Sequence, residues 1–325
     1  NIKVFRHNTA QNNSYIKTNT QKKINMKQKR LTFLLLLISN LFCASAQKWY
    51  KPEIDLKVEE LLSQMTVEEK LGYIGGIDWM YTKSIDRLGI HRMRMSDGPQ
   101  GIGTKGKSTA YPATVTLAAT WNENLAYQYG KALGRDCRAR NINVILGPAV
   151  NIYRAPMCGR NFEYMGEDPY LTSRICVGYI KGVQDQGVMA TVKHFVANNS
   201  DYDRNNISND IDERTLNEIY FPAYKAAIQE AEVGAIMTSY NLMNGIYTTE
   251  NPWLLKEVLR NQWGFKGLVM SDWGSTHYCV SAARSGLDLE MAGGEKMNPK
   301  DMAYYLKTGD VTMDMVDEKV RHILR

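Results

Sequence analysis

The sequence predicts an α/β protein that folds as a (β/α)8 barrel. Eight short apolar runs alternate with amphipathic helical segments, which is the rhythm of eight strand and helix units. The region with this rhythm has the usual length of such a barrel, about 250 residues. Polar residues recur where the apolar runs end, and active sites of these barrels lie at the carboxyl ends of the strands.

The apolar runs are short and rich in Ile, Val, Met and Ala, as expected for strands buried on both faces of a parallel sheet. They are the strands that we expect. They lie near residues 72–77, 92–96, 115–118, 142–147, 188–194, 233–239, 267–272 and 286–290.

Helix-start signals lie between several of these runs. Asn122 precedes a segment with apolar residues at i+4 spacing, and the pairs Asp168-Pro169 and Asn251-Pro252 open two further helices. A doubly wound open sheet is the alternative fold. It would usually show a glycine-rich phosphate loop after its first strand, for which the Gly75-Gly76 pair is a weak substitute. The barrel is therefore the favoured fold.

The first 46 residues predict an upstream segment followed by a secretory signal. Met26 is followed by basic residues, the apolar run 31–43 and the small residues 44–46, which place cleavage before Gln47. The apolar run is shorter than the roughly 20 residues that span a bilayer. Lipidation at Cys43 is disfavoured because bulky Phe42 precedes it. We expect an exported, periplasmic or extracellular barrel domain at residues 47–325.

The charge balance and the cysteine content limit the classes of partner and ligand that we expect the protein to bind. Residues 1–46 hold eight of the 40 basic residues and none of the 34 acidic ones, so 32 basic against 34 acidic residues remain after cleavage. This balance favours neither nucleic acid nor an anionic membrane. The remaining cysteines are irregularly spaced and predict buried thiols, or one or two disulfides, and neither a metal site nor a cofactor. They are Cys137, Cys158, Cys176 and Cys279.

Chemically competent side chains follow the predicted strands. Because parallel strands bring their carboxyl ends together, we expect them on one rim. Each also has a structural explanation: Asp97 as a turn residue, Lys193 as a solvated charge, His194 as a core histidine, and Arg160 with Glu163 as an ion pair. The candidate binding residues are Asp97, Arg160, Lys193, His194, Tyr240 and Trp273, around Asp272 as the candidate catalytic residue.

Asp272 is hardest to explain structurally, because a carboxylate at the end of a core strand needs buried partners. Metal-binding HxH or HExxH patterns, a GxSxG motif and a phosphate loop are absent from the sequence. Charged groups that bind hydroxyl pairs, an aromatic wall and a carboxylate at the anomeric carbon instead suit a sugar. The sequence thus predicts carbohydrate recognition.

Five ordered blocks resemble the N-terminal barrel domain of glycoside hydrolase family 3, the β-glucosidase and β-xylosidase family. They read RMSDGPQGIG, NIYRAPMCGRNFEYMGEDPYL, ATVKHFVANNSDYDRNNISNDIDERTLNEIYFPAYKAAI, AIMTSYNLMNG and GLVMSDWGSTH. The resemblance implies that Asp272 is the nucleophile of a retaining β-glycosidase. It also implies that Asp97, Arg160, Lys193 and His194 bind the sugar hydroxyls, beside Tyr240 and Trp273.

The departures from the family are informative. Members that cleave N-acetylglucosamine linkages carry a second histidine after the Lys-His pair, and "KHFVANNSDYDR" has none. In glucosidase-type members the acid/base is a Glu of a second domain, which we expect to be missing here; Glu163 is a poor candidate because it lies beside Arg160. The expected function is hydrolysis of terminal β-glucosyl residues. β-Xylosides are the alternative substrate, and a non-catalytic carbohydrate-binding barrel is the alternative function.

Overall fold

The computed structural model describes residues 51–103 and 106–325. The expected upstream segment and signal peptide, cleavage at Gln47 and the question of lipidation at Cys43 all lie outside the described residues and stay predictions.

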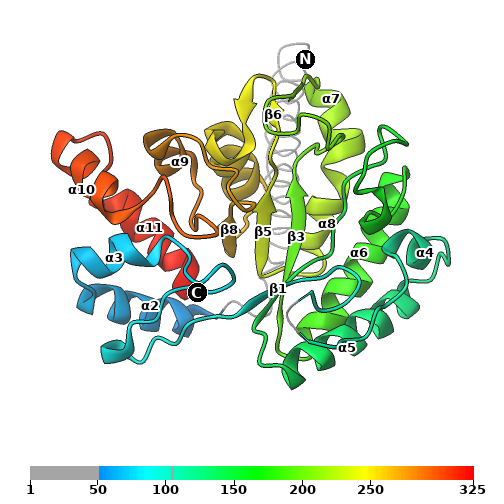
Figure 1. The fold of residues 1–325 in the computed structure, drawn as a ribbon, viewed down its shortest axis with the longest axis horizontal. Helices are drawn as coiled ribbons and strands as arrows, with labels where there is room; N and C mark the ends of the chain where they lie inside the picture. The colour runs from blue at the N-terminus through cyan, green and yellow to red at the C-terminus, as the bar shows by residue number, and fades with distance from the viewer. Residues whose placement is uncertain (1–50, 104–105) are drawn as a thin grey trace, which may run out of the picture. The chain divides into compact units, whose positions relative to one another are not determined.

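Five parallel strands form the central sheet, in the spatial order β1-β2-β3-β5-β8 (Figure 1). They are buried along almost their whole length, which explains why the sequence shows apolar runs rather than alternation. The strands are β1 (Met95–Asp97), β2 (Val144–Leu146), β3 (Met189–Phe195), β5 (Ala235–Thr238) and β8 (Leu268–Met270).

Isolated bridges continue the sheet into a ring. Beyond β8 they are parallel, and then two antiparallel bridges lead back to the residue before β1. In order they are Met270–Leu289, Gly75–Glu290, Ile77–Tyr81 and Tyr81–Arg94. The predicted barrel is thus closed, but part of its wall consists of single bridges that we call the seam (residues 75–81 and 289–290).

One of the eight expected strands was wrong, and two others are reduced to bridges of the seam. Residues 115–118 belong to a helix, α4 (Thr114–Ala118), and the Oγ1 of Thr114 donates a hydrogen bond to the Glu163 carbonyl (2.6 Å). The run 72–77 begins inside helix α3 (Val67–Tyr73), which a capping box between Thr66 and Glu69 starts. Only its end joins the ring. The expected strand 286–290 is likewise reduced to bridges of the seam.

Helices α5 (Glu123–Ala139), α6 (Pro169–Gln184) and α8 (Pro222–Gln229) pack in a row, and α6 and α8 lie against β3 (Figure 1). Two predicted caps are confirmed, because Asn122 accepts from Leu125 N (3.0 Å) and Asp168 from Leu171 N (2.8 Å). The pair α5 and α6 packs closely. A Cβ at Gly182 would lie 2.1 Å from the Tyr127 carbonyl, so only glycine fits there.

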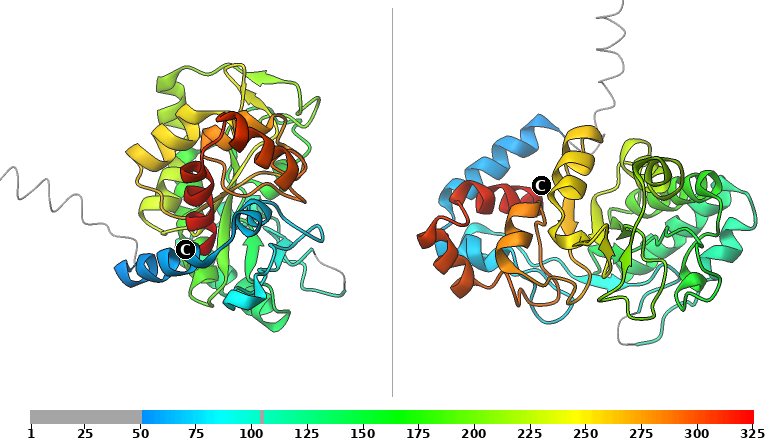
Figure 2. Two further views of the ribbon diagram at one scale, coloured as in Figure 1. Left: turned by 90° about the vertical axis from the view of Figure 1, so that its left-hand side faces the viewer. Right: turned by 90° about the horizontal axis from the view of Figure 1, so that it is seen from above.

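The first and last described helices lie side by side, which both views of Figure 2 show. The apolar face predicted for the closing helix is buried, through Val316, Val320 and Ile323. Arg321 Nε also donates to Glu59 Oε1 (2.5 Å). The first and last described helices are α2 (Pro52–Gln64) and α11 (Met313–Leu324). The other helices near the two ends of the described chain are α3, α9 (Cys279–Ser285) and α10 (Pro299–Thr308).

A buried ion network joins the closing helix to the sheet. The Asp288 carboxylate accepts from Arg260 Nη2 (2.6 Å) and Val269 N (2.8 Å), and its Oδ1 lies 2.8 Å from His322 Nδ1. Arg260 extends from η5 (Trp253–Gln262), a π-helix that follows the predicted Asn251-Pro252 start. The network thus ties η5, α11 and the last segment of the ring together.

The remaining elements lie in the loops between the barrel units. Strands β4, β6 and β7 form a small second sheet in that order. The elements are η1 (Asp86–Leu88), η2 (Asn161–Glu163), β4 (Ser208–Asn209), α7 (Glu213–Thr215), η3 (Leu216–Tyr220), β6 (Leu242–Met243), β7 (Ile246–Tyr247) and η4 (Thr248–Glu250).

The four cysteines of the described part are free thiols, three of them buried, so the disulfide alternative was wrong. Among the helices that the structure describes, none is both long enough and apolar enough to cross a membrane.

Candidate active site

The predicted site residues meet at the carboxyl ends of the parallel strands. Asp97 ends β1, Lys193 and His194 lie near the end of β3, and Tyr240 and Asp272 each follow their strand by two residues. Arg160 comes from the loop between β2 and α6. Because all five strands run in the same direction, residues far apart in sequence gather around one carboxylate.

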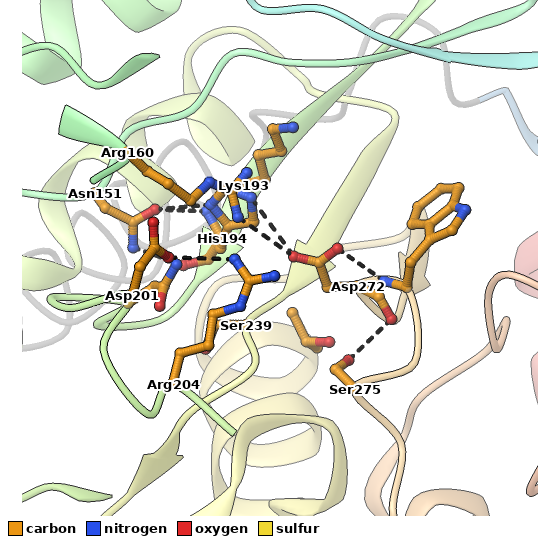
Figure 3. A network of polar contacts seen from close by, with 12 residues as sticks. Asn151, Arg160, Lys193, His194, Asp201, Arg204, Ser239, Asp272 and Ser275 are labelled. Carbon is orange, nitrogen blue, oxygen red and sulfur yellow. Dashed lines mark hydrogen bonds and ion pairs between the residues drawn. The ribbon is translucent and has the colours of Figure 1, made fainter. Parts of the chain in front are cut away.

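Asp272 is the centre of this group (Figure 3). Its Oδ1 accepts a hydrogen bond from Trp273 N (2.8 Å). Its Oδ2 lies 3.9 Å from Arg160 Nη1 and 3.6 Å from His194 Nε2, and has no hydrogen-bond partner although it is buried. Burial raises the pKa of Asp272, and the charges of Arg160 and Lys193 oppose that rise. One carboxylate oxygen is therefore fixed and the other is open to a ligand.

The turn after β8 holds Asp272 in place. The Asp272 carbonyl accepts from Ser275 N (3.2 Å) and Ser275 Oγ (3.0 Å), and Gly274 adopts φ +75°, which favours glycine. The Oγ of Ser271 donates to the Met291 carbonyl (3.2 Å) and accepts from Met291 N (2.9 Å). The backbone on both sides of the carboxylate is thus anchored to neighbouring segments.

Glu163 holds the two cations of the site. Arg160 Nε donates to Glu163 Oε1 (2.5 Å), and Lys193 Nζ lies 3.7 Å from Glu163 Oε2. Burial alone would lower the pKa of Arg160. The charges of Glu163, Tyr164 and Asp272 outweigh this effect and raise the pKa above its ordinary value. The ion pair expected as a structural explanation of Arg160 exists, and the same guanidinium also faces Asp272.

Asp97 and Lys193 differ in burial. The Asp97 side chain is 61% exposed, whereas that of Lys193 is 4% exposed, with 3.8 Å between Oδ1 and Nζ. Lys193 is therefore not the solvated charge of the structural explanation. Both line a pocket of about 430 Å³ together with Arg160, Glu163 and the loop 98–102.

His194 is completely buried. Burial, and then the charges of Arg160, Lys193 and Arg204, lower its pKa well below the ordinary value, so the imidazole is neutral. The His194 carbonyl accepts from Tyr224 OH (2.7 Å). The ring points its Nε2 at the open oxygen of Asp272 (Figure 3).

The two predicted aromatic residues border the carboxylate. Burial, followed by the charge of Asp272, raises the pKa of Tyr240. Trp273 is partly exposed, and its indole Nε1 donates to the Trp79 carbonyl (2.8 Å). Tyr240 is partly buried and lies against Arg204, whereas Trp273 is held by a hydrogen bond to a distant loop.

Arg204 and Asn151 are two further residues of the site that sequence reasoning missed. Arg204 lies 4.0 Å above the ring of Tyr240, and its Nη1 donates to Asp201 Oδ1 (3.2 Å). Figure 3 shows it on the same side of Asp272 as His194. The sequence signal that could have identified Arg204 is its position in the charged segment DYDRNN, shortly after the strand that ends near Lys193 and His194.

The chain is thus an α/β-barrel protein with a candidate ligand site at its strand ends, built around a buried, partly unpaired carboxylate among cations. Comparison with known proteins agrees. The model of the glycosyl hydrolase family 3 N terminal domain matches residues 66–325. The chain belongs to this family.

Curated relatives carry glucosidase names. A beta-glucosidase of Rhizobium radiobacter is 44% identical over 273 residues, covering 82% of this chain and 33% of the relative. Thermostable beta-glucosidase B of Acetivibrio thermocellus is 41% identical over 280 residues, covering 82% and 37%. The chain thus spans well under half the length of these relatives.

The solved structures that the chain resembles also carry beta-glucosidase names. Beta-glucosidase 3B of Thermotoga neapolitana in complex with glucose has a TM-score of 0.78 at 37% identity, covering 82% of this chain and 42% of that chain. Beta-glucosidase of Kluyveromyces marxianus in complex with glucose has a TM-score of 0.81 at 38% identity, covering 82% and 33%.

The exposure of Asp97 leads to a first prediction. Asp97→Ala should change the free energy of unfolding by less than about 0.5 kcal/mol, because the side chain is mostly exposed. It should raise the Kd for a glucose-like inhibitor roughly 10- to 100-fold, since hydrogen bonds to charged groups contribute about 1.5–3 kcal/mol. Calorimetric titration and urea unfolding measure the two quantities.

Glu60→Ala is the matched control, because it removes an exposed carboxylate from α2, a helix that contributes no residue to the site. It should change neither quantity. An Asp97→Ala protein that binds the inhibitor normally would reduce Asp97 to a turn residue.

Proposed function

We propose that this chain is the barrel unit of a retaining β-glucosidase and that Asp272 is its nucleophile. The observation that carries the proposal is the open Oδ2 of Asp272, buried among Arg160, His194 and Lys193 without a hydrogen-bond partner. A ligand that contacts such a buried oxygen offsets the free-energy cost of leaving it unpaired, and an anomeric carbon suits a carboxylate.

The terminal glucosyl residue lies against Asp272 in this proposal. Asp97, Lys193, Arg160, His194 and Arg204 contact its hydroxyl groups, and Tyr240 and Trp273 flank its apolar face. Charged hydrogen bonds inside a closed site are strong and directional, so they fix C1 in front of Oδ2.

The reaction proceeds by double displacement. The Asp272 oxygen forms a bond to C1 while the bond from C1 to the leaving oxygen breaks, and a general acid protonates that oxygen. Water, deprotonated by the same group, then attacks C1 and releases Asp272. Both carboxylate oxygens of Glu163 face cations. We therefore assign the acid/base to a second domain of the full protein, in keeping with the greater length of the relatives.

Glucosides are preferred to xylosides as substrates in this proposal, because the relatives are named beta-glucosidases and related structures hold glucose.

A dinitrophenyl β-glucoside tests the proposal on this chain alone. Dinitrophenolate departs with little protonation, so Asp272 should be glucosylated even without an acid. General base help contributes about 10²–10⁴-fold, so the ester should then break down slowly. We expect one equivalent of dinitrophenolate, a glucosyl group on the Asp272 peptide by mass spectrometry, and β-glucosyl azide when azide is added.

The matching β-xyloside should react more slowly than the glucoside, and cellobiose should be almost inert. A glucosyl group mapped to another carboxylate would refute the assignment of Asp272. Efficient cellobiose hydrolysis by this chain would instead show that the acid lies within the barrel.

A further inference from the structure

Asn151 holds His194 through three contacts (Figure 3). Its Oδ1 accepts from the His194 backbone N–H (2.8 Å) and lies 3.2 Å from the ring Nδ1. Its Nδ2 donates to the His194 carbonyl (2.9 Å). Asn151 is 2% exposed, so these contacts are shielded from water.

The backbone of His194 fixes the orientation of this amide. The backbone N–H requires an acceptor and the carbonyl requires a donor, so the Asn151 oxygen and nitrogen cannot exchange places without losing both hydrogen bonds. The amide oxygen therefore faces Nδ1. Because two acceptors do not bond each other, Nδ1 must carry the ring proton.

A neutral imidazole has one proton, so its Nε2 is then a bare acceptor. Burial, followed by the charges of Arg160, Lys193 and Arg204, lowers the pKa of His194 and keeps the ring neutral. Nε2 and Asp272 Oδ2 lie 3.6 Å apart, are both buried and both lack a hydrogen-bond partner. Tyr164 lies edge to face against the ring, with 6.2 Å between centroids, and its hydroxyl accepts from Asn198 Nδ2 (3.3 Å).

We propose that Asn151 is a positioning residue that locks His194 as a hydrogen-bond acceptor toward the substrate. Nε2 and Oδ2 form a pair of acceptors for hydrogen bonds that the hydroxyl groups of the sugar bound at Asp272 donate. The identity of the ligand rests on the proposed function, whereas the locked tautomer rests on the Asn151 contacts alone. Charge on the ring abolishes the acceptor, so the site binds its sugar only while His194 is neutral.

Nitrogen NMR of the chain labelled with ¹⁵N-histidine tests the lock without any substrate, because protonated and bare ring nitrogens have well separated shifts. His194→Gln identifies the signal among the five histidines. In the wild-type protein Nδ1 should be protonated and Nε2 bare at neutral pH.

Two variants of Asn151 distinguish positioning of the His194 ring proton from a general structural role of the side chain. Asn151→Leu fills the space but removes the acceptor, so the proton should move to Nε2, which can then bond to Asp272. Asn151→Asp keeps an oxygen at Nδ1 and should keep Nδ1 protonated. Its added negative charge should raise the pKa of His194. On acidification, the rate at which the dinitrophenyl glucoside glucosylates Asp272 should therefore begin to fall at a higher pH than in the wild type. Asn241→Leu replaces a buried amide that does not contact His194, and should leave the tautomer unchanged.

A wild-type His194 protonated at Nε2 overturns the proposal, as does an Asn151→Leu protein that keeps Nδ1 protonated. The wild-type spectrum decides even if Asn151→Leu does not fold, which circular dichroism establishes. A chain that shows the expected tautomer but whose Asp272 is not glucosylated would refute the proposed function and leave the lock intact.

Discussion

Asp272→Ala should lower the rate of dinitrophenolate release from the β-glucoside by at least about 10⁴-fold, the scale on which loss of a catalytic nucleophile acts in other enzymes. The side chain supplies the only group that the mechanism bonds to C1, and activation of the leaving group does not replace it. Stopped-flow absorbance for the wild type and long incubations for the variant measure both rates.

The stereochemistry of azide rescue makes the result specific. Asp272→Ala leaves a space on the face of C1 from which Asp272 attacks, so azide entering there should produce α-glucosyl azide. The wild-type chain should produce the β-anomer, because azide then displaces Asp272 from the opposite face. Formation of the β-anomer by both proteins would assign the nucleophile to another residue.

Glu163→Ala should lower the free energy of unfolding by about 3–5 kcal/mol, because removing one partner of a buried ion pair leaves uncompensated charge. Glu163 is the shared anion of Arg160 and Lys193, whose side chains are 19% and 4% exposed. Urea unfolding followed by tryptophan fluorescence measures the change. Glu163→Gln, which keeps the shape, should cost less, about 1–3 kcal/mol.

Glu59→Ala is the control for this prediction. Its pairing with Arg321 is also short, but the two side chains are 52% and 34% exposed, so the loss should stay below about 1 kcal/mol. If Glu163→Ala were as stable as Glu59→Ala, the cations would be held by other groups, and Glu163 would not organise the site.

The sequence predicts the fold best where the chain is both apolar and bounded by clear signals. The runs that became β1, β2, β3, β5 and β8 end at turns or polar residues, and Asn122 and Asp168 cap their helices as expected. The prediction of a strand at residues 115–118 was wrong because a short run with Thr and Val fits a strand or a buried helix equally well. The choice depends on Thr114 meeting the loop around Glu163, which is 49 positions away.

The gathering of the predicted site residues also follows from sequence, because the carboxyl ends of parallel strands must lie together. Their burial does not. Nothing local distinguishes Lys193, 4% exposed, from Asp97, 61% exposed. Asn151 was overlooked for the same reason: it looks like an ordinary loop residue until a histidine 43 positions later meets its amide.

The seam also constrains when the protein can fold during synthesis. Gly75 joins Glu290, and Glu59 meets Arg321, which follows it by 262 positions. A ribosome must therefore release nearly all of residues 51–325 before the ring can close. Until residues 289–290 are available, β8 and the segment at Gly75 are open edges, which other chains can pair with. The nascent barrel is thus most prone to pairing with other chains before residues 289–290 have emerged.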